Sequence, residues 1–121
     1  MKPGPRMSGK PSSKADVLQG TLDLMVLQTL ESMGPQHGYS IAARLEQVSS
    51  GALQLNMGTL YPALMRLEQR GLLKGTWGTT DTNRKARFYA LTAAGRRQLA
   101  KEKEAWDQMA GIIHVLLHGE G

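Results

Sequence analysis

The chain has 121 residues, enough for one domain and a short tail, and it carries a formal net charge of +5. It contains no cysteine, which excludes a disulfide framework and thiol catalysis. No apolar run approaches the roughly 20 residues of a membrane span, and the N-terminus lacks the apolar stretch of a secretory signal. The expected location is therefore the cytoplasm.

Positive charge is concentrated in two segments. Residues 1–14 carry four basic residues and no acidic residue, and residues 66–103 carry ten basic against three acidic residues. The remaining segments, residues 15–65 and 104–121, are each net acidic. A basic block within a folded segment is typical of proteins with a polyanionic partner, although charge alone is equally compatible with a generic basic surface.

The first fifteen residues are rich in proline, glycine, serine and lysine. This composition cannot bury apolar surface, so residues 1–15 are expected to form a disordered basic tail. An apolar stripe then predicts a helix over residues 15–33, and its width indicates packing partners on two sides. Gly34-Pro35 ends this helix, and Gly38-Tyr39 begins a second helix that ends at residues 49–51.

A third helix is predicted between Asn56, a helix N-cap residue, and Gly71, a residue typical of the position after a helix. Leu60, Leu64 and Leu67 recur at the spacing of one helix face. The opposite face carries hydroxyl, aromatic and guanidinium groups: Thr59, Tyr61, Arg66 and Arg70. Such a helix can pack on a core and present polar groups to DNA, although a solvated face has the same composition.

Pro62 lies inside this third helix, beyond its first turn. Because proline has no amide hydrogen, it removes the bond to the carbonyl of Gly58. We therefore expect a distortion or kink in the first turn.

The periodicity changes after the third helix. Residues 72–78 are predicted to form a strand, residues 79–83 a turn, and residues 84–91 a returning strand. Lys85 and Arg87 alternate with apolar residues on the returning strand, so they share one face of this β-hairpin. That arrangement suits contact with a nucleic-acid backbone or a minor groove. Trp77 on the first strand is expected to pin the hairpin.

Thr92 is the predicted N-cap of a last helix that extends to residue 118. This helix has two columns of residues spaced seven apart, and all but one are apolar: Leu99, Trp106 and Ile113; Glu102, Met109 and Leu116. A seam of this length indicates a partner helix.

Three helices followed by a basic hairpin is the order of a winged helix-turn-helix. The expected fold class is thus mainly α with a small β-hairpin. The domain organisation is a tail of residues 1–15, a winged-helix DNA-binding domain of residues 16–91 and a C-terminal dimerisation helix of residues 92–118.

The chain from about residue 18 to residue 117 resembles the PadR family of bacterial transcriptional regulators. The most specific match is the run Gly58-Thr59-Leu60-Tyr61-Pro62-Ala63-Leu64, continuing to Gly71. Shorter matches are Gly20-Thr21-Leu22, His37-Gly38-Tyr39, Trp77, Lys85-Ala86-Arg87-Phe88-Tyr89, and Leu91-Thr92 with Gly95-Arg96. The single C-terminal helix is similar to the shorter branch of the family.

The resemblance implies a homodimer held by the first and last helices, and a third helix that contacts a pseudo-palindromic operator on double-stranded DNA, usually in repression. The candidate DNA-binding residues are Tyr39, Met57, Thr59, Tyr61, Arg66, Arg84, Lys85 and Arg87. The candidate dimer-interface residues are Leu22, Leu99, Trp106, Met109, Ile113 and Leu116.

Several alternatives remain open at this stage. Tyr39 can contact a phosphate or pack in the core, and Trp106 can line a site for a planar aromatic inducer or simply pack in the dimer. His114 and His118 lie four residues apart but lack a third ligand, so no metal site is expected.

No enzymatic activity and no cofactor are expected, because no nucleophile–base pair, carboxylate pair or phosphate-binding loop is evident. The competing function is a dimeric small-molecule-binding protein that does not use its hairpin on DNA. A dimeric helical scaffold is a third, weaker alternative.

Overall fold

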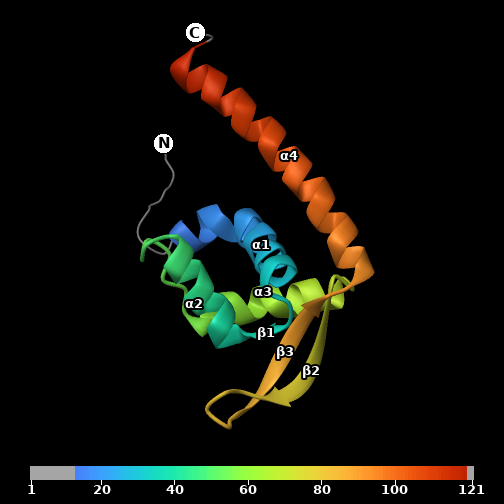
Figure 1. Ribbon diagram of the computed structural model, residues 1–121. Coiled ribbons are helices and arrows are strands. Elements are labelled where there is room, and N and C mark those ends of the chain that lie inside the picture. The colour runs from blue at the N-terminus through green and yellow to red at the C-terminus, as the bar shows by residue number, and fades with distance from the viewer. Residues whose placement is uncertain (1–12, 120–121) are drawn as a thin grey trace, which may run out of the picture.

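Four helices and three strands follow one another in residues 13–119, the part of the chain that the computed structural model describes (Figure 1). Their order is α1 Ser13–Met33, β1 Gln36–His37, α2 Gly38–Val48, α3 Met57–Gln69, β2 Leu73–Thr79, β3 Lys85–Leu91 and α4 Ala93–His118. The predicted fold class, mainly α with a small β-hairpin, is confirmed. None of the described helices is long and apolar enough to cross a membrane.

The first helix begins earlier than predicted. Residues 13–15, the end of the predicted tail, are already helical. The rest of that tail prediction, residues 1–12, lies outside the described residues.

The predicted helix caps are confirmed at three positions. Asn56 accepts a hydrogen bond from the amide of Thr59 at 2.9 Å, and Thr92 accepts one from the amide of Gly95, also at 2.9 Å. Gly71, just after α3, has φ of 77°, a left-handed conformation that glycine adopts without steric cost. The boundaries of α3 and α4 therefore follow from local sequence chemistry.

Pro62 lies inside α3 without ending it, and the expected distortion of the first turn stays a prediction. The amides of Thr59 and Leu60 both donate to the carbonyl of Asn56 at 3.1 Å, and the helix continues without a break to Gln69. Gly58, whose carbonyl loses its donor at Pro62, is exposed. Water can therefore satisfy that carbonyl, which lowers the cost of a proline at this position.

The sheet has three antiparallel strands in the order β1-β3-β2. β2 and β3 form the predicted hairpin, with Trp77 opposite Arg87 and Thr79 opposite Lys85. The sequence did not predict β1, because a strand of two residues has no periodicity to detect. β1 anchors the hairpin to the start of α2 through the pair His37–Phe88, whose rings meet edge to face with centroids 5.3 Å apart.

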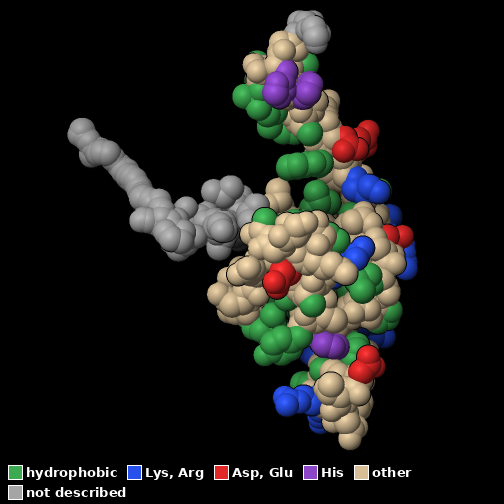
Figure 2. All heavy atoms as spheres, turned by 60° about the vertical axis from the view of Figure 1, so that its left-hand side comes forward, with side chains coloured by type: hydrophobic (Ala, Val, Ile, Leu, Met, Phe, Trp, Pro, Cys, Tyr) green, Lys and Arg blue, Asp and Glu red, His purple; other side chains and the backbone are tan. Residues whose placement is uncertain are grey.

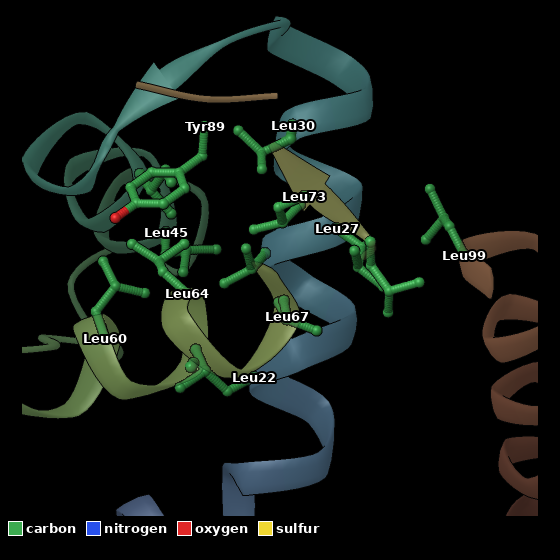
Figure 3. Packing of buried hydrophobic residues seen from close by; sticks show 14 residues of the cluster. Leu22, Leu27, Leu30, Leu45, Leu60, Leu64, Leu67, Leu73, Tyr89 and Leu99 are labelled. Carbon is green, nitrogen blue, oxygen red and sulfur yellow. The ribbon is translucent and has the colours of Figure 1, made fainter. Parts of the chain in front are cut away.

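The hydrophobic core lies between α1, α2, α3, the base of the sheet and the first turns of α4 (Figure 3). Leu22 and Leu99, two predicted dimer-interface residues, belong to this core, and each is only 4% exposed in the single chain. Almost none of their surface remains for a partner. Their assignment to a dimer interface is therefore corrected to core packing, since both belong to the hydrophobic cluster of the single chain.

Beyond Leu99, α4 extends away from the rest of the molecule (Figure 1). Hydrophobic side chains lie exposed along this protruding segment (Figure 2). They are Trp106, Met109, Ile112, Ile113, Val115, Leu116 and Leu117, each at least 44% exposed. We call this segment, residues 106–117, the outer half of α4.

Candidate nucleic-acid interface

A groove of about 840 Å³ lies between the start of α2, α3 and the β2–β3 hairpin. We call that hairpin, residues 73–91, the wing. The groove is lined by His37, Tyr39, Tyr61, Trp77, Thr80, Asp81, Thr82, Arg84, Lys85, Ala86, Arg87 and Tyr89. It brings together five of the eight residues that the sequence proposed for DNA binding: Tyr39, Tyr61, Arg84, Lys85 and Arg87.

Tyr39 is the second residue of α2, and its side chain is 67% exposed. Core packing, one of the two alternatives for this residue, is therefore excluded. The side chain of His37 caps the same helix by accepting from the amide of Ser40 at 3.4 Å. Tyr39 thus projects from a capped helix start into the groove, where its hydroxyl can reach a phosphate.

Tyr61 lies on the α3 side of the groove and is 38% exposed. Met65 and Gln69, four and eight residues further along α3, are also exposed. These three positions share one outward face of the helix because their spacing is close to the helical repeat. Sequence reasoning missed Met65 and Gln69, although the four-residue spacing from Tyr61 was a sufficient signal.

Three other predicted DNA contacts on α3 do not line the groove. Met57 packs partly buried against the core, and Thr59 is half-buried beside the N-cap. Arg66 extends toward α1, where its Nη2 lies 2.6 Å from Oδ1 of Asp23. Arg66 therefore pairs α3 with α1, and its predicted role as a DNA contact stays a prediction.

Trp77 is exposed on the wing, at 64%, rather than enclosed as a residue that pins the hairpin would be. Lys85 Nζ lies 5.4 Å from the centroid of its ring, and the guanidinium carbon of Arg87 lies 5.9 Å from it. Both distances are within the range of cation–π attraction. The indole and the two basic side chains therefore form one surface of the wing that faces the groove.

Arg87 is not a free cation. Its Nη2 donates to Oε2 of Glu68 on α3 at 2.6 Å, and this hydrogen bond raises the pKa of the Arg87 guanidinium above its usual value. Beneath it, Tyr89 is buried, and burial raises the pKa of the Tyr89 hydroxyl. The contact between α3 and the wing is thus an ion pair over a buried tyrosine.

Arg84 and Lys85 differ from Arg87 in this respect. Among the side chains that the structure describes, neither has a carboxylate within ion-pairing distance. Both are exposed at the edge of the groove. Lysine and arginine side chains in this state are available to phosphate oxygens.

A second hollow, of about 410 Å³, lies between α1, α2 and α4. Trp106 borders it, opposite Leu24 and Met25 of α1 and Val48 of α2. Arg44, Lys103 and Asp107 are also in its lining, so it combines an aromatic ring, apolar walls and charged groups of both signs. We call this hollow the Trp106 cleft.

His114 and His118 lie next to each other on α4, with ring centroids 4.7 Å apart. Among the side chains that the structure describes, no group of three or more metal-ligating residues is present. Two neighbouring histidines alone do not make a structural metal site.

Comparison with known proteins identifies the family. The model of the Transcriptional regulator PadR-like family matches residues 26–101. The chain is 37% identical over 65 residues to transcriptional regulator Rv3488 of Mycobacterium tuberculosis. The aligned region covers 54% of this chain and 60% of that protein. The chain is 38% identical over 80 residues to an uncharacterized 37.1 kDa protein in transposon TN4556 of Streptomyces fradiae, covering 66% of this chain and 21% of that one. The chain thus spans about three fifths and one fifth of the lengths of these relatives.

The fold is also similar to that of solved PadR-like regulators. A PadR-like transcriptional regulator from Bacillus cereus superposes with a TM-score of 0.74 at 27% sequence identity, over 87% of this chain and 99% of that one. The family match includes the C-terminal part of α1, all of α2 and α3, the wing and the first third of α4. The chain therefore belongs to the PadR-like family of transcriptional regulators, which are not enzymes.

Proposed function

We propose that this transcriptional regulator binds a specific, pseudo-palindromic operator as a homodimer, represses transcription, and is released by a small ligand. The observation that carries the proposal is the groove between α3 and the wing. On one side α3 contributes Tyr61, and on the other the wing contributes Arg84 and Lys85. Met65 and Gln69 are exposed further along the same face of α3. A helix that enters the major groove beside a basic wing is the usual arrangement for reading DNA.

The roles of the two sides differ. Arg84 and Lys85 contact phosphates, which gives affinity without sequence preference. The outward face of α3 contacts base edges, where Gln69 can bond an adenine and Met65 can pack on a thymine methyl group. Tyr39 adds a phosphate contact from the start of α2.

Dimerisation follows from the outer half of α4. Its hydrophobic side chains are each at least 44% exposed in the single chain. Apolar surface on this scale marks an interaction site. A second copy of the chain related by two-fold symmetry covers the same surface on both subunits and presents two copies of α3 to the two operator half-sites. Trp106, Met109, Ile113 and Leu116 are the proposed interface residues.

Regulation by a ligand is proposed for the Trp106 cleft. The indole offers a flat apolar face, and the lining of Leu24, Met25 and Val48 suits a planar aromatic compound. Such a compound acts as an inducer only if it favours a dimer whose two α3 helices no longer match successive major grooves.

The test is selection of binding sites from random DNA with the full chain, followed by titration of the selected operator at several salt concentrations. The expected result is an inverted repeat with half-sites about one helical turn apart. Affinity should fall steeply as salt rises. The opposite outcome has three parts: no sequence is enriched, Lys85→Gln leaves DNA binding unchanged, and Trp106 still binds aromatic compounds. The protein is then a small-molecule-binding dimer that does not use its wing on DNA.

A further inference from the structure

The basic residues of the wing that line the groove are of two kinds. Arg84 and Lys85 lie at the groove edge with no carboxylate partner among the described side chains. Arg87 lies deeper, between the wing and α3, and its charge is matched by Glu68 at 2.6 Å. Both members of the pair are partly shielded, with 33% of the Arg87 side chain and 29% of the Glu68 side chain exposed.

Several contacts besides Glu68 hold Arg87 in place. The guanidinium passes directly over Gly75 of β2, where an added Cβ would lie 2.6 Å from Nε. The ring of Trp77 lies 5.9 Å away on the groove side. Arg87 is therefore positioned by the sheet below it, by an aromatic ring beside it and by a carboxylate from α3. To reach a phosphate, it must leave all three.

Pairing changes what an arginine contributes to DNA affinity. Each phosphate that a basic side chain neutralises releases condensed counterions, so the logarithm of the binding constant falls by about 0.9 per contact for each unit of log salt. An arginine already neutralised by a carboxylate does not add such a contact. The carboxylate of Glu68 also repels a phosphate that approaches the same place.

We propose that Glu68 is a positioning residue that sets DNA specificity, because it fixes the wing against α3 through Arg87 and withholds that arginine from backbone phosphates. This inference rests on the proposed DNA-binding function. Its consequence is a lower affinity for DNA of any sequence without a loss of the contacts that α3 makes to the operator. The ratio of specific to non-specific binding is therefore higher than the number of basic residues on the wing implies.

The experiment uses the full chain, the selected operator and a scrambled duplex of the same length, each titrated over a range of salt concentrations. Glu68→Gln is compared with Glu31→Gln as a matched control. Glu31 pairs with Arg96 at 3.2 Å between α1 and α4, away from the groove, so the control removes an equal charge and also breaks an ion pair.

The expected result for Glu68→Gln is tighter binding to the scrambled duplex and a salt slope steeper by about one unit, as one phosphate contact requires. The ratio of operator affinity to scrambled-duplex affinity should fall by roughly fivefold to tenfold. A tenfold fall corresponds to about 1.4 kcal/mol. Glu31→Gln should change the slope by much less.

Two further variants separate this role from a merely structural one. Arg87→Gln alone should leave the salt slope on the scrambled duplex unchanged, and Arg87→Gln combined with Glu68→Gln should restore the wild-type slope. The proposal is overturned if Arg87→Gln alone lowers the slope by about one unit, because Arg87 is then a phosphate contact. It is also overturned if Glu68→Gln folds normally but matches Glu31→Gln. If wild-type protein shows no salt-dependent binding to either duplex, the proposed function itself fails.

Discussion

The ring of Tyr61 on α3 lies directly against Gly38, the first residue of α2. A Cβ added at Gly38 would come within 3.2 Å of the ring and of the hydroxyl oxygen of Tyr61. The absence of a side chain at one helix start therefore sets how closely the other helix approaches, and with it the position of Tyr61 in the groove.

Gly38→Ala should weaken operator binding more than it changes stability. Alanine favours the helix by up to about 1 kcal/mol, and this gain offsets the close contact, because the partly exposed ring of Tyr61 can move outward. We expect the free energy of unfolding to change by less than about 1 kcal/mol. Operator affinity should fall roughly tenfold, equivalent to about 1.4 kcal/mol.

The measurements are urea denaturation and operator titration. Gly20→Ala on α1 is the control, because an added Cβ at Gly20 meets no atom within 4 Å. Unchanged operator affinity in Gly38→Ala would show that the position of Tyr61 does not matter for binding.

Arg66→Ala should destabilise the fold rather than alter DNA binding. Asp23, its partner, is only 14% exposed, so removal of the guanidinium leaves a shielded carboxylate without its ion-pair partner. The expected loss is about 1–3 kcal/mol in the free energy of unfolding. The salt slope of DNA binding should stay the same, because Arg66 does not line the groove.

Arg96→Ala is the matched control for that measurement. Arg96 and Glu31 are 62% and 43% exposed, and a pair so open to water contributes at most about 1 kcal/mol. If Arg66→Ala proves no more destabilising than Arg96→Ala but lowers the salt slope, Arg66 is a DNA contact, as its sequence position first indicated.

Ile113→Asp should convert the proposed dimer to a monomer without unfolding the winged helix. Ile113 is 45% exposed in the single chain, so a charge there meets water in the monomer but loses it in the dimer. A buried, unpaired carboxylate costs several kcal/mol, which raises the dimer dissociation constant by at least about a hundredfold. Sedimentation equilibrium measures this change, and Gln108→Glu on the same helix is the control. A stable dimer of Ile113→Asp would exclude the outer half of α4 as the interface.

Much of the fold could be predicted from local sequence because its signals are local. Asn56 and Thr92 begin helices with a hydrogen bond three residues along the chain, and such bonds depend only on neighbouring residues. The heptad columns of α4 predicted a partner, but they did not separate Leu99, which the same chain buries, from Ile113, which it leaves exposed. A repeat of hydrophobic residues predicts that one helix face packs against something. It does not predict whether the same chain or a second chain supplies that contact.

The candidate site was harder to predict because its polar groups are arranged by long-range contacts. Asp23 and Arg66 are 43 residues apart, and Glu68 and Arg87 are 19 apart. Nothing in the neighbourhood of either arginine shows that a carboxylate will lie beside it in the fold. The charged residues of the wing and of α3 can be read from the sequence, but which of these charges are paired cannot.

Tyr89 should make the fold sensitive to alkali. Burial raises the pKa of its hydroxyl above the ordinary value of 10.0, so the folded protein keeps a proton that the unfolded chain releases. This stabilisation is complete below about pH 10 and is lost as pH rises through the higher folded-state pKa.

Urea denaturation on both sides of pH 10 tests this. Tyr89→Phe should lose less free energy of unfolding at alkaline pH than wild type. Tyr39→Phe, at an exposed position, should behave like wild type. Equal alkaline losses in all three would mean that ionisation of Tyr89 does not oppose folding.

Planar aromatic compounds should quench the fluorescence of Trp106 and weaken operator binding over the same concentration range. Trp106 borders the 410 Å³ cleft between α1, α2 and α4, so a ring stacked on the indole also contacts helices that position α3. The measurement requires a Trp77→Phe background, because the exposed indole of the wing contributes its own signal and lies at the proposed DNA site. Trp106→Ala in that background should bind the compounds at least tenfold more weakly, a loss of about 1.4 kcal/mol. If operator affinity is unchanged at saturating compound, the quenching is incidental to regulation. If Trp106→Ala binds the compounds as tightly as its parent, the ring serves only to pack α4.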